Sequence, residues 1–130
     1  MAIIRITNLK LRTIIGIHDW EQEHKQDVVL NITIHFDAQQ ACASDNIKDA
    51  VDYKAITKKI IQEVEASRFF LLERLADRVL AIVMNSPRVE NAAVRVDKPF
   101  ALRFADSVSV ELTKSRKHAG DEDAAYPERE

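Results

Sequence analysis

Hydrophobic and polar residues alternate most regularly between residues 27 and 37. The even-numbered residues from Val28 to Phe36 are all large and apolar, whereas most of the residues between them are polar. A period of two over this length predicts a β-strand with one buried face. Residues 3–15 alternate less regularly, but they are rich in aliphatic and β-branched side chains and are followed by Gly16. We therefore expect a second strand there, close enough in sequence to pair antiparallel with the first.

The hydrophobic period becomes helical in the middle of the chain. Ser44, Asp45 and Asn46 can cap a short helical turn, and Asp52 can cap a longer helix. The apolar positions of that longer helix are Ile56, Ile60, Ile61 and Val64. A second helix is expected after residues 67–68, and its apolar stripe consists of Leu72, Leu75, Val79, Ile82 and Val83, with Pro87 just beyond its end.

Two further strands complete the pattern, at residues 92–97 and 106–113. The order ββααββ predicts an α+β domain with a four-stranded antiparallel sheet and both helices on one face. The other sheet face would be polar, and its expected residues are Arg5, Asn31, Thr33, His35, Arg95, Ser109 and Glu111. We expect a single domain over residues 1–113 and a charged, disordered tail over residues 114–130.

Composition narrows the functional classes. The 130 residues suit one domain, and a net charge of −2 does not suggest a nucleic-acid-binding protein. No apolar run approaches the roughly 20 residues that span a bilayer. The single cysteine, Cys42, excludes an internal disulfide and favours the cytoplasm. The two glycines are too few for a phosphate-binding loop, and the four histidines lack metal-ligand spacing, so we expect neither a metal nor a cofactor.

Candidate chemical groups lie at the ends of the expected elements, where functional sites are common. Glu21 follows the first strand, Tyr53 begins the first long helix, Glu73 lies on the second helix and Lys98 closes the third strand. Taken singly, each also fits an ordinary role. Glu21, Glu73 and Lys98 would be solvated charges, and Tyr53 a half-buried packing residue.

Four segments in order resemble the dihydroneopterin aldolase family. They are residues 15–21 (IGIHDWE), 51–53 (VDY), 71–77 (LLERLAD) and 94–99 (VRVDKP). Each would be weak alone, but their common order and spacing make the resemblance specific. It extends from about Ile3 to Leu112.

The family has two branches. One is an aldolase of folate biosynthesis, which forms 6-hydroxymethyl-7,8-dihydropterin and glycolaldehyde. The other is a 2′-epimerase of dihydroneopterin triphosphate, which feeds tetrahydromonapterin synthesis. Residues 101–110 (ALRFADSVSV) and 26–35 (QDVVLNITIH) are similar to the epimerase branch, whereas residues 19–22 (DWEQ) are similar to the aldolase branch. The resemblance thus implies an epimerase first and an aldolase as the alternative.

The resemblance also implies roles for individual residues. Glu73, with Leu72, would bind the pterin, because a carboxylate pairs strongly with two N–H groups. Glu21 and Lys98 would perform acid–base chemistry through a water molecule, and Tyr53 would transfer a proton at the pterin side chain. The pterin itself would accept the electrons, so that no metal or Schiff base is needed. Arg103, Arg68 and Lys54 are candidates for contacting a triphosphate, although each also fits an ordinary surface charge.

The same resemblance implies a tunnelling fold. Subunits would close into a barrel of tetrameric rings that stack as an octamer, with sites between neighbours and with Tyr53 and Glu73 from different subunits. Closure would protect the free edges of an open sheet. Two other functional classes remain open. One is a binding module that keeps a pterin pocket without catalysis, and the other is a purely structural oligomer.

Overall fold

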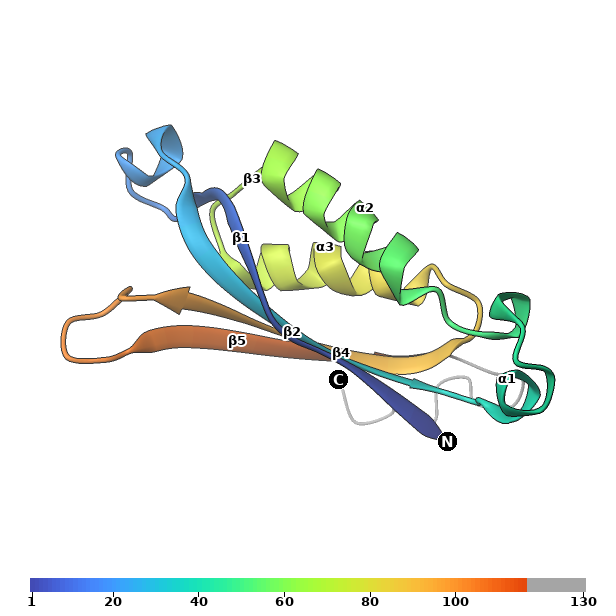
Figure 1. Cartoon of the computed structure of the whole chain (residues 1–130). Coiled ribbons are helices and arrows are strands. Elements are labelled where there is room, and N and C mark those ends of the chain that lie inside the picture. Colours follow the sequence, from blue (N-terminus) through green and yellow to red (C-terminus); the bar gives the residue numbers. More distant parts are fainter. Residues whose placement is uncertain (117–130) are drawn as a thin grey trace, which may run out of the picture.

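The structure, a computed structural model, describes residues 1–116, which form a curved β-sheet with helices on one face (Figure 1). The strand order is β3-β1-β2-β4-β5. The strands are β1 (Ala2–Ile15), β2 (Gln26–Phe36), β3 (Arg68–Phe69), β4 (Val89–Pro99) and β5 (Ser107–Ser115). The α-helices are α1 (Gln39–Ser44), α2 (Tyr53–Ala66) and α3 (Leu72–Met84), and two 3₁₀ turns are η1 (Glu21–Glu23) and η2 (Ile47–Asp49).

The α+β class is confirmed, but the expected four-stranded antiparallel sheet is wrong in one respect. The four long strands do pair antiparallel, yet the sheet is mixed and five-stranded because β3 runs parallel to the end of β1. Ile14 is opposite Arg68 and Ile15 is opposite Phe69. A strand of two residues has no visible alternation, so the hydrophobic pattern could not reveal it. The expected helices are α2 and α3, and the short helix α1 adds a third.

A β-bulge explains the imperfect alternation in the first strand. The pairing register between β1 and β2 shifts between Ile6 and Leu9, and Asn8 takes a left-handed backbone conformation with φ 55°. The side-chain oxygen of Asn31 accepts a hydrogen bond from the Asn8 N–H at 2.9 Å. The extra residue changes the phase of the strand, so that Leu11 faces the same core as Ile4.

The two long helices bury one apolar face each against the sheet. Helix α2 begins at the expected cap, where the Asp52 carboxylate accepts the Ala55 N–H at 3.0 Å. Its buried residues are Ile56, Ile60 and Val64, and those of α3 are Leu75, Ala76, Val79, Leu80, Ile82 and Val83. Helix α3 begins differently, because Leu71 occupies its N-cap and no side chain caps it. Its first N–H groups therefore remain free of intrahelical and capping partners.

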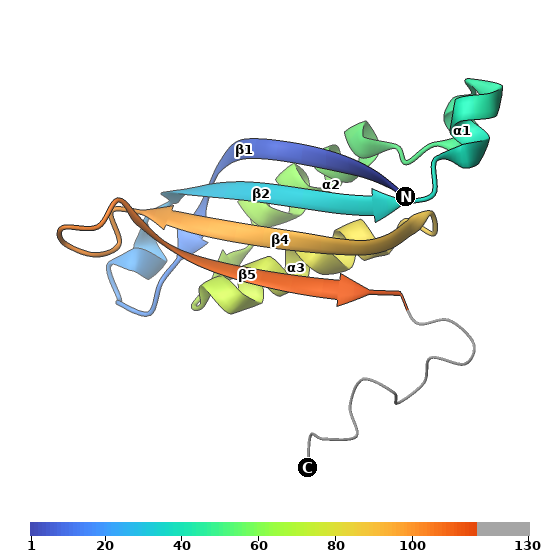
Figure 2. The same cartoon turned by 90° about the horizontal axis from the view of Figure 1, so that it is seen from below.

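The opposite face of the sheet has no helix over it among the described residues, as the view from below shows (Figure 2). The expected polar residues share this face, since Arg5 is opposite Thr33, and Arg95 is opposite both Asn31 and Glu111. The polar second face is thus confirmed.

The end of β5 is attached to the end of α3. Arg116 Nη2 donates hydrogen bonds to the carbonyl oxygens of Met84 at 2.7 Å and Ser86 at 2.9 Å. The strand therefore extends to Ser115, two residues beyond the end expected for it. The tail expected over residues 114–130 lies outside the described residues from position 117 onward. Within residues 1–116, no helix has the length and apolar character needed to cross a membrane.

The hydroxyl of Thr13 gives a test of how β1 is joined to α2. It is fully buried and donates to the Val64 carbonyl at 2.7 Å, and its oxygen also lies 3.1 Å from the Ser67 carbonyl oxygen. We expect Thr13→Val, which keeps the shape, to lower the free energy of unfolding by about 1–3 kcal/mol, because buried carbonyls lose a donor. Urea denaturation at one protein concentration measures this. Thr113→Val, at an exposed position of β5, is the control, and equal effects of both changes would contradict the assignment.

Candidate functional site

A cavity of about 440 Å³ opens where the end of β1, the start of α3 and the β4–β5 connection meet. Its lining comes from four separate stretches of the chain, which the sheet and the helix hold together. They are residues 15–18 with Glu21, residues 70–73, Lys98 with Ala101 and Leu102, and Val108 with Val110. The walls are mainly apolar, and Glu21, Glu73 and Lys98 are the ionisable carboxylates and amine among them. A mainly apolar cavity with a few convergent polar groups is typical of a small-molecule site.

Glu21 and Lys98 form an ion pair inside this cavity. Lys98 Nζ lies 2.5 Å from Glu21 Oε2, although the two residues are 77 positions apart in sequence. The side chains are 6% exposed for Glu21 and 15% exposed for Lys98. The turn η1 brings Glu21 back under the end of β1, and the last part of β4 supplies Lys98. A charge pair with this little solvent contact interacts more strongly than a surface pair.

Two further hydrogen bonds hold the Glu21 carboxylate. Gln26 Nε2 donates to Oε2 at 3.2 Å, and the His18 N–H donates to Oε1 at 3.2 Å. Burial alone would raise the pKa of the Glu21 carboxyl, but the hydrogen bonds from Lys98, Gln26 and His18 outweigh it and hold that pKa below its ordinary value. Glu21 is therefore a carboxylate at neutral pH.

Gly16 makes room for that carboxylate. Its φ of 135° is one that side-chain-bearing residues rarely adopt, and a Cβ placed on it would collide with the Glu21 carboxyl group. Its N–H donates to the Phe69 carbonyl at 3.1 Å, across the short parallel pairing with β3. Gln22 Nε2 also donates to both the Gly16 and the Phe69 carbonyls, at 2.7 and 3.0 Å. The glycine thus connects the loop of Glu21 to the segment before α3.

Glu73 and Leu72 also line the cavity, from the first turn of α3. Glu73 is exposed, and within residues 1–116 its carboxylate makes no hydrogen bond or ion pair. Arg78, further along the same helix, is bound to Glu63. A free carboxylate beside uncapped helix N–H groups offers both acceptors and donors to a ligand.

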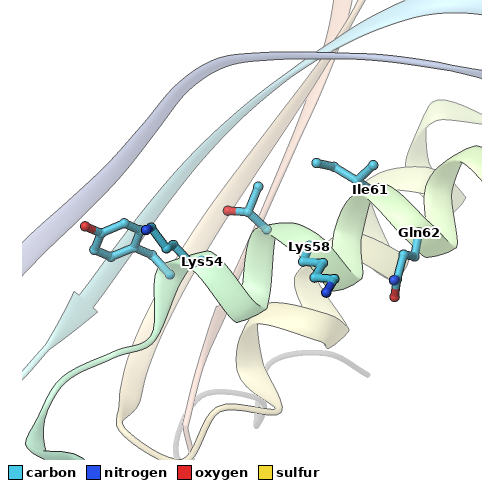
Figure 3. Close-up of a pocket in the computed structure, with 6 residues that line it drawn as sticks. Lys54, Lys58, Ile61 and Gln62 are labelled. Atoms are coloured by element: carbon cyan, nitrogen blue, oxygen red, sulfur yellow. The ribbon is translucent and has the colours of Figure 1, made fainter. Parts of the chain in front are cut away.

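Tyr53 is not in this cavity. It is 53% exposed at the start of α2, and with Lys54 it lines a separate hollow of about 430 Å³ on that helix (Figure 3). One chain therefore brings together Glu21, Leu72, Glu73 and Lys98 but leaves Tyr53 and Lys54 apart.

The two candidate arginines are near the cavity but not in its lining. Arg103 lies in the β4–β5 connection with its guanidinium 5.5 Å from the Phe104 ring centre. Arg68 begins β3, and its Nη1 donates to the Gln22 carbonyl at 3.3 Å.

The hydrophobic pattern missed three residues that shape the site, namely Gly16 as the space for Glu21, and Gln22 and Gln26 as amide donors. Gln26 reaches the Ile15 carbonyl at 2.7 Å as well as the Glu21 carboxylate. A glutamine at the start of a strand looks like an ordinary polar residue. The one available signal was Gly16, because a lone glycine after a strand marks a close backbone approach.

Comparison with known proteins gives a consistent family. The family model described as FolB: Dihydroneopterin aldolase matches residues 4–113. The dihydroneopterin triphosphate 2′-epimerase of Escherichia coli (strain K12) is 51% identical over 115 residues, which cover 88% of this chain and 96% of that protein. The dihydroneopterin aldolase of the same strain is 35% identical over 113 residues, covering 85% of this chain and 90% of the relative.

A solved structure agrees with the fold. The crystal structure of E. coli dihydroneopterin aldolase in complex with neopterin superposes with a TM-score of 0.84 at 31% identity, covering 88% of this chain and all (100%) of that one.

The lowered pKa of Glu21 predicts a pH-dependent contribution to stability. A carboxyl whose pKa is lower in the folded state stabilises the fold above the pKa of the unfolded chain, and that contribution is lost as the pH falls through the folded-state value. We expect Glu21→Gln to lower the free energy of unfolding by about 1–3 kcal/mol at neutral pH. The difference from the unaltered protein should shrink as the medium becomes acidic.

Denaturant titrations at a series of pH values measure this difference. Glu23→Gln is the matched control, because Glu23 is exposed in the same 3₁₀ turn. Taking the difference between proteins cancels other groups with lowered pKa, such as Glu63. A difference that stays constant with pH would show that the pair does not hold Glu21 ionised.

Proposed function

Because this chain belongs to the dihydroneopterin aldolase family, we propose that it is a 7,8-dihydroneopterin triphosphate 2′-epimerase. The observation that carries the proposal is the difference in identity, 51% to an epimerase against 35% to an aldolase, each over most of both chains. Aldolase activity on 7,8-dihydroneopterin is the second candidate. Residues 19–22 (DWEQ), which resemble the aldolase branch, support it.

The pterin ring would bind between the apolar walls of the 440 Å³ cavity. Glu73 is suited to accept hydrogen bonds from the amino group and a ring N–H of the pterin, since its carboxylate has no other partner within residues 1–116. The N–H groups at the start of α3, that of Leu72 among them, are suited to donate to a ring acceptor, since no side chain caps this helix. The neopterin bound by the E. coli aldolase supports a pterin-sized ligand for the fold.

The chemistry then falls to Glu21 and Lys98. A base takes the proton of the 2′-hydroxyl through a bound water, the C2′–O bond becomes a carbonyl, and the C1′–C2′ bond breaks. The bonding electrons pass to C1′ and into the pterin ring, which leaves an enol on the ring and a separate aldehyde. A carboxylate hydrogen-bonded to a lysine can exchange protons with that water in both directions.

The second half of the reaction decides the product. In epimerisation the aldehyde rotates in the site so that C1′ attacks its other face. The new alkoxide then regains the proton, so that C2′ is inverted and no atom is lost. In the aldolase reaction C1′ is protonated instead and the aldehyde leaves. Tyr53 would transfer the proton at the pterin side chain, because a phenol both donates and accepts.

Tyr53 can reach such a substrate only if it comes from another copy of the chain, since it lies outside the cavity of its own. We propose the tunnelling fold, with tetrameric rings stacked as an octamer. The two outer long strands of the sheet, β1 and β5, run antiparallel to one another, so that β5 of one copy can pair with β1 of the next around a ring. The polar face would line the tunnel. We further propose a cytoplasmic enzyme with one folded domain over residues 1–113.

The function is tested by supplying each substrate separately. We expect purified protein to convert 7,8-dihydroneopterin triphosphate mainly to the 2′-epimer, 7,8-dihydromonapterin triphosphate, as resolved by chromatography after oxidation. If instead free 7,8-dihydroneopterin yields mostly 6-hydroxymethyl-7,8-dihydropterin, the aldolase is the main activity. Turnover of neither substrate would leave a pterin-binding protein without catalysis.

Glu73 is tested on the same assay. We expect Glu73→Gln to reduce kcat/KM by roughly 10- to 100-fold, since a charged hydrogen-bond acceptor is replaced by a neutral one. Asp77→Asn is the control, one turn along on α3 and also exposed. Because both side chains are exposed, circular dichroism and melting temperature should be unaltered. Equal kinetics for the two variants would remove Glu73 from the pterin site.

A further inference from the structure

Among the described residues, 1–116, the lining of the cavity that would hold the pterin offers no free lysine or arginine for a triphosphate. Besides the imidazole of His18, its lining contains two carboxylates, Glu21 and Glu73, and one amine, Lys98, which is already bound to Glu21. A triphosphate carries several negative charges, and a net negative cavity repels them. If the proposed substrate is correct, the cations that bind its phosphates must come from outside this cavity.

Two unpaired lysines stand beside Tyr53 on α2. The hollow on this helix lies between two rows of side chains with helical spacing, Tyr53–Thr57–Ile61 and Lys54–Lys58–Gln62 (Figure 3). Within residues 1–116, neither Lys54 nor Lys58 forms an ion pair or a hydrogen bond through its ammonium group. The next cation, Lys59, does have a partner, since its Nζ is 3.5 Å from Glu63.

The two arginines that the sequence offered for the triphosphate are already engaged. Arg68 donates to the Gln22 carbonyl, and Arg103 lies over the Phe104 ring. Lys54 and Lys58 are therefore better placed to exchange water for phosphate, because no protein contact has to be broken.

We propose that Lys54 and Lys58 bind the triphosphate of the substrate held by a neighbouring copy. This inference rests on the proposed function, in which Tyr53 of one copy acts at the side chain of the pterin bound by another. The phosphates continue from the end of that same side chain. Lys54 follows Tyr53 directly, and Lys58 is one turn further, about 6 Å along the helix axis. The two ammonium groups and the Thr57 hydroxyl then contact successive phosphates.

The lysines would act as specificity determinants for the phosphorylated substrate. They have nothing to bind in free dihydroneopterin, so their contribution belongs to the triphosphate alone. The measured quantity is the ratio of kcat/KM for the triphosphate to kcat/KM for the free pterin.

The first experiment compares variants on this ratio. We expect Lys54→Gln/Lys58→Gln to raise KM for the triphosphate and to lower the ratio by about tenfold or more, since hydrogen bonds to charged groups contribute at that level. The charge-preserving pair Lys54→Arg/Lys58→Arg should restore most of it. Lys59→Gln on the same helix is the matched control. The unaltered protein should also lose affinity for the triphosphate with added salt more steeply than the double variant.

The outcomes separate two failures. If the unaltered protein does not convert the triphosphate at all, the proposed function is wrong. If it does, and the double glutamine variant keeps its KM and ratio, the proposed function stands and the role of the lysines is refuted.

A mixed oligomer tests whether the lysines act on a neighbour's site. A chain with Lys54→Gln/Lys58→Gln keeps Glu73, and a chain with Glu73→Ala keeps both lysines. Co-expression with two different affinity tags and sequential purification isolates oligomers that contain both. Sites formed by Glu73 of the first chain and the lysines of the second are complete, so we expect the low KM for the triphosphate to reappear. If the low KM for the triphosphate is absent from the mixed oligomers as well as from the two separate variants, the lysines act on the site of their own chain, and the proposed contact with a neighbour's substrate is refuted.

Discussion

The ion pair between Glu21 and Lys98 is the interaction on which the arrangement of the site depends. It joins residues 77 positions apart, and both side chains are largely removed from water. Such a pair is costly unless the remaining hydrogen-bonding capacity of the carboxylate is used, and here Gln26 and the His18 N–H use it. The carboxylate therefore remains ionised and fixed in position. A fixed pair of opposite charges in the lining of an apolar cavity is suited to the two opposite proton transfers of the proposed reaction.

This pair exists only because the backbone leaves space for it. Gly16 lies against the Glu21 carboxyl group in a conformation that side-chain-bearing residues rarely adopt, and the short strand β3 holds the glycine through the Phe69 carbonyl. Phe69 is followed within three residues by α3, whose first turn supplies Glu73 to the same cavity. The smallest element of the sheet thus joins the loop that carries Glu21 to the helix that carries Glu73.

The sequence predicted those parts of the fold that depend on a long, regular period. The alternation in β2 and the apolar stripe of α3 identify their elements directly. It failed where local geometry breaks the period, at the Asn8 bulge, or where an element is too short to have one, at β3. For the site, the family resemblance pointed to residues that the hydrophobic period could not distinguish from ordinary surface residues. The amide donors Gln22 and Gln26 and the space at Gly16 depend on how residues 15–26 fold back on themselves and against Phe69, which periodicity does not encode.

The proposed binding of the phosphates by α2 of a neighbouring copy bears on which product forms. Epimerisation and aldol cleavage share every step up to the separate aldehyde, so they differ in how long that fragment stays in place. In the phosphorylated substrate the aldehyde fragment carries the triphosphate. Cations that bind the phosphates therefore hold the fragment after the C1′–C2′ bond has broken, while rotation about its own bonds still exposes the other face of the carbonyl. Free dihydroneopterin yields a small neutral aldehyde with no such attachment. Phosphate binding by α2 would then select the substrate and, by retaining the fragment, favour re-addition over release.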